Sequence, residues 1–88
     1  MFFVYILKSE KHRRHYIGFS DDLRERLKKH NKGYVFSTKP YLPWDIVYYE
    51  AYRTKDEAMK REHNLKLRSN AWNQLKRRIK DSLKFNAD

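Results

Sequence analysis

Glu62 is the residue that points most directly to chemistry, because a carboxylate stands on the apolar face of a predicted helix. The segment Thr54–Glu57 forms a capping box, so a helix is expected to begin after Thr54. Its inward stripe contains Ala58, Glu62 and Leu65. Burying an unpaired charge is unfavourable by several kcal/mol. Glu62 therefore requires a basic side chain, a metal ion or a water-filled cleft, and an ion pair with a Lys or Arg is the simplest of these.

Arg26 and His30 raise the same question on an earlier helix. The run from Asp21 to His30 is predicted to be helical, with Leu23 and Leu27 as its inward stripe. His30 falls on that stripe, and Arg26 lies at its edge, four residues earlier. Taken separately, a core histidine and an arginine that reaches solvent explain both residues.

Tyr5 and Tyr16 lie on two short segments that are predicted to pair as strands. Phe2–Leu7 is apolar, aromatic and β-branched, and the second strand ends at Gly18. The polar segment Ser9–Arg14 between them favours an antiparallel hairpin. If the strands pair, the two phenols come close together at the edge of a small sheet.

One shared cleft explains the inward polar residues with fewer assumptions than separate explanations do. Phosphodiester hydrolysis is the chemistry that suits them. One carboxylate, with waters and a substrate phosphate, can hold Mg²⁺, and an arginine can neutralise charge on phosphoryl oxygens. A phenol or an imidazole can orient or deprotonate the attacking water. The residues concerned are Tyr5, Tyr16, Arg26, His30 and Glu62.

The other elements complete an α+β fold: a small three-stranded antiparallel sheet flanked by helices, in the order β-β-α-β-α-α. The third strand is predicted at Trp44–Tyr49, with Trp44, Ile46 and Tyr48 on one face and Val47 and Tyr49 on the other.

The helix ends and the last helix are predicted from caps and periodicity. Ser20 is expected to cap the first helix, and Ser69 or Asn70 the third. Phe85–Asp88 is expected to be frayed. The third helix is expected to have one continuous apolar stripe, made of Trp72, Leu75, Ile79 and Leu83.

The connection from Tyr34 to Pro43 carries three aromatic residues and Lys39. Long loops in small domains are often functional, and aromatic rings beside a cation can stack on bases. A lid over the edge of the core is the interpretation that we favour. In the hairpin loop, His12 and His15 lack the further ligands that a zinc site needs.

The chain is strongly basic: 21 Lys and Arg against 11 Asp and Glu give a formal net charge of +10 and a pI near 9.9. This charge favours nucleic acid as the partner, although a solvated basic surface or anionic lipid would also explain it. With 88 residues, a single domain spanning 1–88 is expected. The chain has no cysteine, and we see no signal peptide and no apolar run of membrane-spanning length. We therefore expect a cytoplasmic protein with no membrane partner.

Taken together, the motifs resemble the GIY-YIG endonuclease family. Val4–Ile6 and Tyr16–Ser20 resemble its two opening motifs, and Leu23–Asn31 resembles its first helix. Pro43–Tyr49 resembles its third strand, and Glu57–Glu62 the helix with its metal-binding glutamate. The resemblance runs from Phe3 to about Lys66. It is closest to small stand-alone bacterial members, which are similar to the nuclease domain of a bacterial excision-repair endonuclease. Phe3 stands where the family has its first glycine, and a strand position accepts this change.

This resemblance implies a metal-dependent endonuclease that acts on DNA, with structure-directed cleavage and a role in repair. It implies one divalent ion, Mg²⁺ or Mn²⁺, on Glu62, and the scissile phosphate on Arg26, with His30 assisting. Tyr5 and Tyr16 would line the site, and one of them would aid the nucleophilic water.

Further basic residues are expected to bind nucleic acid, namely Lys39, Lys66, Arg68, Arg77 and Arg78. Two alternatives stay open: a nucleic-acid-binding module that does not cleave, and a partner protein within a repair complex. Larger family members usually carry separate domains for target recognition, and this chain has no room for one. Specificity is therefore expected to be low, structure-directed or supplied by a protein partner.

Overall fold

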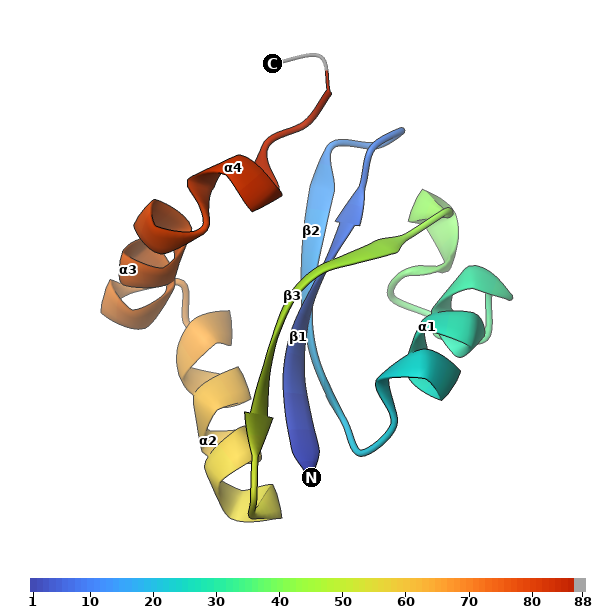
Figure 1. Ribbon diagram of the computed structural model, residues 1–88. Coiled ribbons are helices and arrows are strands. Elements are labelled where there is room, and N and C mark those ends of the chain that lie inside the picture. The colour runs from blue at the N-terminus through green and yellow to red at the C-terminus, as the bar shows by residue number, and fades with distance from the viewer. Residues whose placement is uncertain (87–88) are drawn as a thin grey trace.

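The computed structural model, which describes residues 1–86, contains one antiparallel sheet between two layers of helices (Figure 1). The strands are β1 (Phe2–Ser9), β2 (Arg14–Ser20) and β3 (Asp45–Tyr52), in the spatial order β2-β1-β3. The predicted α+β fold and the order of its main elements are confirmed. The helices are α1 (Leu23–Asn31), a short 3-10 helix η1 (Lys39–Tyr41), α2 (Lys55–Lys66), α3 (Asn70–Arg78) and α4 (Lys80–Leu83).

Both layers pack on β1. Val4 and Ile6 belong to a core cluster with side chains from α2, α3 and α4. Tyr5 and Leu7 belong to a second cluster on the opposite face, with Trp44 and the leucines of α1. Figure 1 shows the sheet nearly edge-on between these two layers. The unbroken apolar run of β1 follows from this arrangement, because a strand that is covered on both faces has no polar side.

A bulge in β3 changes which of its side chains share a face. Ile6 pairs with Tyr48 while Leu7 pairs with Ile46, so Val47 is an extra residue. Ile46 therefore packs in the cluster of Leu7, and Tyr48 packs in the cluster of Ile6. Our prediction that Ile46 and Tyr48 share one face is wrong, because a bulge interrupts the two-residue alternation of a strand.

The first helix is capped by Asp22 rather than by Ser20. The Asp22 carboxylate accepts a hydrogen bond from the N–H of Glu25 at 3.0 Å. The Ser20 hydroxyl instead accepts from the N–H of Asp22 at 3.0 Å, so the predicted cap supports the observed one. Thr54 caps α2 as predicted, accepting from the N–H of Glu57 at 3.3 Å.

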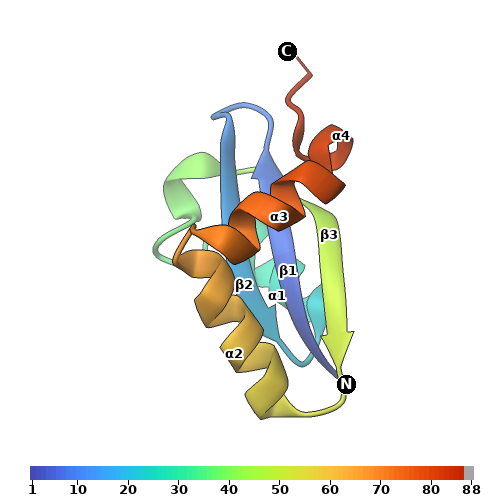
Figure 2. The ribbon, with the colours of Figure 1, turned by 90° about the vertical axis from the view of Figure 1, so that its left-hand side faces the viewer.

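The predicted third helix is two helices, because the backbone leaves helical geometry at Ile79. Its φ and ψ are −115° and 33°. The chain changes direction there (Figure 2), and Leu83 is buried in the same core cluster as the apolar residues of α3. The Leu83 carbonyl accepts a hydrogen bond from Nε2 of His15 at 2.8 Å, which fixes α4 against the hairpin. Ser69 precedes α3 without a side-chain capping bond.

The segment after α4 packs on the hairpin. Phe85 stacks on His15 with ring centroids 4.8 Å apart, and the N–H of Asn86 donates to Glu10 at 3.0 Å. Our prediction of a frayed Phe85–Asp88 is therefore wrong for Phe85 and Asn86, while Ala87 and Asp88 lie outside the described residues. Within residues 1–86 no helix is long and apolar enough to cross a membrane.

The loop between α1 and β3 is only partly a lid. Tyr41 packs on Trp44, with ring centroids 6.5 Å apart. Tyr34 and Phe36 are 73% and 94% exposed, so the lid prediction is wrong for these two side chains.

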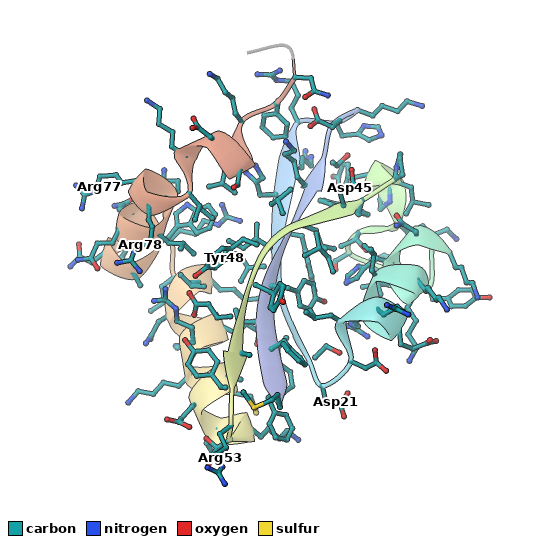
Figure 3. The ribbon with its side chains drawn as sticks, viewed as in Figure 1. Asp21, Asp45, Tyr48, Arg53, Arg77 and Arg78 are labelled. Atoms are coloured by element: carbon teal, nitrogen blue, oxygen red, sulfur yellow. The ribbon has the colours of Figure 1, made fainter. Side chains whose placement is uncertain are left out.

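A polar cluster of Tyr48, Glu50, Tyr52 and Arg61, here called the Glu50 cluster, joins α2 to β3. The Glu50 carboxylate accepts hydrogen bonds from Arg61 Nε and Nη2 at 2.8 and 3.0 Å. It also accepts from Tyr48 and Tyr52 at 2.6 and 2.5 Å. Burial alone would raise the pKa of Glu50, but these hydrogen bonds outweigh it and lower the pKa. Figure 3 shows Tyr48 on the side of the sheet that faces α2. The cluster holds α2, and with it Glu62, against the sheet.

Candidate active site

A chain of hydrogen bonds runs from Arg26 through Tyr5 and His30 to Thr38. Arg26 Nε donates to Tyr5 Oη at 3.4 Å. Tyr5 Oη lies 2.9 Å from His30 Nε2, and His30 Nδ1 lies 2.7 Å from Thr38 Oγ1. Tyr5, His30 and Thr38 are all buried. Three parts of the chain therefore meet here: β1, α1 and the loop before η1.

The directions of these hydrogen bonds fix the tautomer of His30. The Thr38 hydroxyl donates to the carbonyl oxygen of Val35 at 3.3 Å, so it accepts from His30 Nδ1–H. Nε2 then carries a lone pair and accepts from the Tyr5 hydroxyl. The oxygen of Tyr5 in turn accepts from Arg26. Each of these hydrogen bonds therefore joins a donor to an acceptor, and the series begins at the positive charge of Arg26.

Burial keeps Tyr5 and His30 neutral. It raises the pKa of the Tyr5 phenol to about 12; the hydrogen bond from Arg26 opposes this, while Tyr16 and Glu62 reinforce it. Burial, and then the positive charge of Arg26, lowers the pKa of His30 to about 4. At neutral pH Tyr5 is a phenol and His30 an uncharged imidazole, as the hydrogen-bond directions require.

Gly18 makes room for the Tyr5 ring. The two residues are opposite each other in the ladder between β1 and β2. A Cβ atom at Gly18 would lie 2.3 Å from both Cζ and Oη of Tyr5, far inside van der Waals contact. The glycine of the Tyr16–Gly18 segment is therefore required by the ring that carries the catalytic hydroxyl candidate, a reason that the sequence did not reveal.

Tyr16 is half-buried on β2 and lies beside the hydrogen-bonded residues Tyr5 and His30. Its ring centroid is 5.1 Å from that of His30 and 6.4 Å from that of Tyr5. The hydrogen bond to Tyr5 raises the pKa of Arg26, and Tyr16 acts in the same direction. Arg26 has no carboxylate partner within residues 1–86, so its charge is not neutralised there. We call Tyr5, Tyr16, Arg26, His30 and Thr38 the Tyr5 cluster.

Glu62 lies at the border of the Tyr5 cluster, paired with a lysine. Its Oε2 is 3.1 Å from Nζ of Lys66, one turn later on α2. The side chains of Glu62 and Lys66 are 22% and 49% exposed, so the pair lies near the surface. Nζ of Lys66 also lies over the Tyr16 ring, 5.9 Å from its centroid. The basic partner that we expected as the simplest explanation of Glu62 is present, and it links Glu62 to Tyr16.

The structure thus brings the five predicted catalytic residues into one region. Hydrogen bonds connect three of them, ring contacts add Tyr16, and Lys66 and an electrostatic effect on Tyr5 connect Glu62. Two supporting residues, Asn31 and Thr38, were not predicted from the sequence. Asn31 holds the loop by bonding both N–H and C=O of Trp44, at 2.7 and 2.9 Å. Its place beside His30 was a usable signal, whereas nothing in the sequence marked Thr38.

The basic residues predicted to bind nucleic acid do not converge on the Tyr5 cluster. Lys66 is at its border, and the stem of Lys39 packs against Gly33 in the neighbouring loop. Arg68 lies over the Trp72 ring, 4.8 Å from its centroid.

Arg77 and Arg78 point outward from α3, on the far side of the sheet from α1 (Figure 3). Arg77 lines an open groove of about 800 Å³ between α3, α4 and the hairpin. Among residues 1–86, those that line the groove include no carboxylate, and its cations are Lys76, Arg77, Lys80 and Lys84.

The donor set at Glu62 fits magnesium or manganese rather than zinc. No group of three or more His, Cys, Asp or Glu within residues 1–86 is placed to hold a metal ion. Zinc sites use three or four protein ligands. Mg²⁺ keeps several waters and is often bound through one or two carboxylates and a substrate phosphate, so the single carboxylate of Glu62 at the border of the Tyr5 cluster fits it.

Relatives and a family profile match most of the chain. The UPF0213 proteins of Staphylococcus aureus strains Mu3, Mu50 and N315 are each 43% identical to it over 65 residues, covering 73% of this chain and 78% of theirs. No solved structure matches this chain. The profile of the GIY-YIG catalytic domain matches residues 1–77, which include all five predicted catalytic residues and Gly18. This chain therefore belongs to the GIY-YIG family of nucleases.

Proposed function

We propose that this protein is a metal-dependent endonuclease that hydrolyses phosphodiester bonds in DNA. The observation that carries the proposal is Arg26, a guanidinium held against two phenols with no carboxylate partner within residues 1–86. Such a cation suits an anionic phosphate, because its planar fork can bind two phosphoryl oxygens. Membership of a nuclease family supports the same substrate class.

In the proposed reaction, a water oxygen attacks the phosphorus of a diester bound to Arg26. The bond from phosphorus to one ester oxygen breaks, and that oxygen takes up a proton from solvent. Tyr16, the more accessible ring, orients the water. As the water gives its proton to the Tyr5 oxygen, Tyr5 releases its own proton to His30 Nε2, which already accepts its hydrogen bond.

Binding of phosphate at Arg26 would favour this proton transfer. The charge of Arg26 is the second cause, after burial, of the low pKa of His30. A bound anion offsets that charge, so the imidazole becomes more basic when the substrate is present.

Glu62 would hold the divalent ion, Mg²⁺ or Mn²⁺, in place of Lys66. When bound, such an ion polarises phosphoryl oxygens and lowers the pKa of coordinated water. An exposed ion pair contributes only about 0 to 1 kcal/mol, so little opposes the displacement of Lys66. The freed ammonium can then contact a phosphate.

The basic residues outside the site would bind the phosphate backbone. We assign this role to Lys39, Lys66, Arg68, Arg77 and Arg78, with the basic groove on α3 and α4 as further support. Each phosphate contact that is lost should reduce the slope of log affinity against log salt by about 1. Structure-directed cleavage, a repair role, a protein partner and a cytoplasmic location stay predictions.

The test compares the unmodified protein with Glu62→Gln on nicked, flapped and branched DNA in Mg²⁺ or Mn²⁺. Cleavage by the unmodified protein and none by Glu62→Gln is expected, with both proteins equally folded by circular dichroism. Lys60→Gln, an exposed position on the same helix, is the matched control and should cleave normally. Equal cleavage by the unmodified protein and Glu62→Gln would contradict the proposal.

A binding module without cleavage is the second candidate, favoured by the groove, which lies away from the Tyr5 cluster. It predicts steeply salt-dependent DNA binding with no strand breaks in either metal. Cleavage that disappears in Glu62→Gln would exclude it.

A further inference from the structure

Phe36 and Tyr34 are two exposed aromatic side chains in the loop that follows α1. Single apolar residues on a surface are common and need no explanation. Phe36 differs from such residues because backbone hydrogen bonds hold its loop, the loop is bonded to the candidate active site, and the stretch of sequence around it carries exposed lysines.

The backbone of this loop is fixed on both sides of Phe36. Gly33, at φ 77°, ends α1 in a Schellman motif, with the N–H groups of Gly33 and Tyr34 bonded to the last turn of the helix. The carbonyl of Val35, directly before Phe36, accepts hydrogen bonds from the backbone N–H groups of Thr38 and Lys39, at 3.1 and 3.0 Å. The loop therefore presents the Phe36 ring to solvent on a defined backbone.

The same loop is bonded to the catalytic histidine candidate. Thr38 accepts the hydrogen bond of His30 Nδ1 at 2.7 Å. Phe36 is two residues before Thr38, so their Cα atoms are at most about 7 Å apart. Arg26 is bonded to Tyr5, Tyr5 to His30 and His30 to Thr38, so this loop belongs to the same hydrogen-bond series as the proposed phosphate ligand.

The stretch of sequence that carries the ring is basic. No Asp or Glu occurs from position 26 to position 44. An exposed ring among exposed cations offers stacking to a base and attraction to its phosphate. An apolar protein surface gains nothing from these cations, so a nucleobase is the occupant that the charges favour. The exposed cations of this stretch are Lys28, Lys29, Lys32 and Lys39.

We propose that Phe36, assisted by Tyr34, stacks on an unpaired nucleobase close to the scissile phosphate. The inference rests on the proposed function for what Arg26 binds, and it adds the substrate class: nucleic acid with an unstacked base beside the cleavage point. In a continuous duplex every base is already stacked on its neighbours, and the Phe36 ring has no base to cover.

The test measures binding in EDTA, so that no cleavage occurs. Two DNA molecules carry the fluorescent base 2-aminopurine, unpaired at a flap junction in one and paired within a duplex in the other. The protein and Phe36→Trp should quench the unpaired base. Phe36→Ala should not, and should bind the flap DNA on the order of tenfold more weakly. Its affinity for the duplex should not change. Because the ring is exposed, its removal should leave the melting temperature unchanged, which thermal melting checks.

Met59→Ala is the matched control, because Met59 is an exposed apolar side chain on α2. It should quench and bind as the unmodified protein does. Equal quenching by Phe36→Ala and the unmodified protein would overturn the proposal. The proposal would also be overturned if Phe36→Ala kept its affinity for the flap DNA but no longer bound phosphatidylserine vesicles, because the ring would then contact a membrane. The same holds if Phe36→Ala kept that affinity but lost a dimer that the unmodified protein forms, because the ring would then contact a second copy.

The two proposals fail in different ways. A protein that quenches the unpaired base through Phe36 but cleaves nothing in Mg²⁺ or Mn²⁺ retains the stacking site and contradicts the nuclease activity. A protein that cleaves, with Phe36→Ala indistinguishable from it on both DNA molecules, retains the activity and contradicts the stacking site.

Discussion

The Glu50 cluster on one face of the sheet and the Tyr5 cluster on the other each contain two tyrosines and one arginine. In the Glu50 cluster, both tyrosines and Arg61 donate to one carboxylate, at 2.5 to 3.0 Å. In the Tyr5 cluster, Arg26 donates to a neutral phenol at 3.4 Å, and that phenol donates to a neutral imidazole.

The difference lies in the anion. Glu50 neutralises Arg61 and leaves that cluster complete, so it serves to hold α2 on β3. The Tyr5 cluster satisfies its hydrogen bonds but keeps a net positive charge, which a substrate phosphate can neutralise. Residue types alone therefore do not distinguish a structural cluster from a candidate functional one, and the presence or absence of a built-in counter-ion is the difference between these two.

Removing Arg26 should produce the largest effect. Arg26→Ala is expected to lower the single-turnover cleavage rate by about 100- to 1000-fold, the usual result of deleting one group that stabilises developing charge. Its free energy of unfolding, measured in urea, should change by less than about 1 kcal/mol, because the 3.4 Å hydrogen bond is long. A large loss of stability with normal cleavage by the folded protein would reverse the roles of the two clusters.

Removing Arg61 should show the opposite pattern. Arg61→Ala deletes a bidentate pair with half-buried Glu50 and should lower the free energy of unfolding by about 2 to 3 kcal/mol. Cleavage by the protein that remains folded should fall by less than about tenfold. Urea denaturation measures the first effect, with Lys60→Ala as an exposed control on the same helix. Unchanged stability would show that the Glu50 cluster does not hold α2.

The two clusters should lose stability in different pH ranges. Because the pKa of His30 is lowered to about 4, the unfolded chain binds more protons than the folded one between pH 6.5 and 4. Stability therefore falls by about 2 kcal/mol as the pH drops from 6.5 to 4.5. His30→Gln should remove this part of the slope in urea titrations. Glu50, with a lowered pKa, loses its contribution only below about pH 4.5, so that loss should persist in His30→Gln. An identical slope in both proteins would contradict a buried neutral His30.

Removing Lys66 should have the smallest effect on stability. Lys66→Met breaks an exposed pair within one helix, so the free energy of unfolding should change by less than about 0.5 kcal/mol. Manganese should bind more tightly, because Glu62 loses a competing cation. The fraction of free Mn²⁺, followed by electron paramagnetic resonance, measures this, and Glu62→Gln should abolish the gain. Weaker manganese binding in Lys66→Met would show that Lys66 does not compete for Glu62.

Much of the fold could be predicted because local rules agreed with the tertiary structure. The apolar run of β1, the capping box at Thr54 and the leucines of α1 each marked an element correctly. The errors came from long-range packing. Val47 became a bulge because β1 sets the register of β3, and Ile79 broke a periodic helix where Leu83 is buried against the core. Neither event changes the sequence pattern in its neighbourhood.

The sequence by itself determined which residues could do chemistry: polar side chains on apolar faces identified Arg26, His30 and Glu62. Only the tertiary structure decided how these groups act. It directed the hydrogen bond of the Tyr5 hydroxyl to His30, placed Thr38 as the partner of the other ring nitrogen of His30 and required glycine at position 18. It also left Arg26 without an anion within residues 1–86 while it completed the Glu50 cluster. The physical reason is that periodicity places a side chain on a face, whereas burial and hydrogen-bond partners, which set its charge, come from residues distant in the chain.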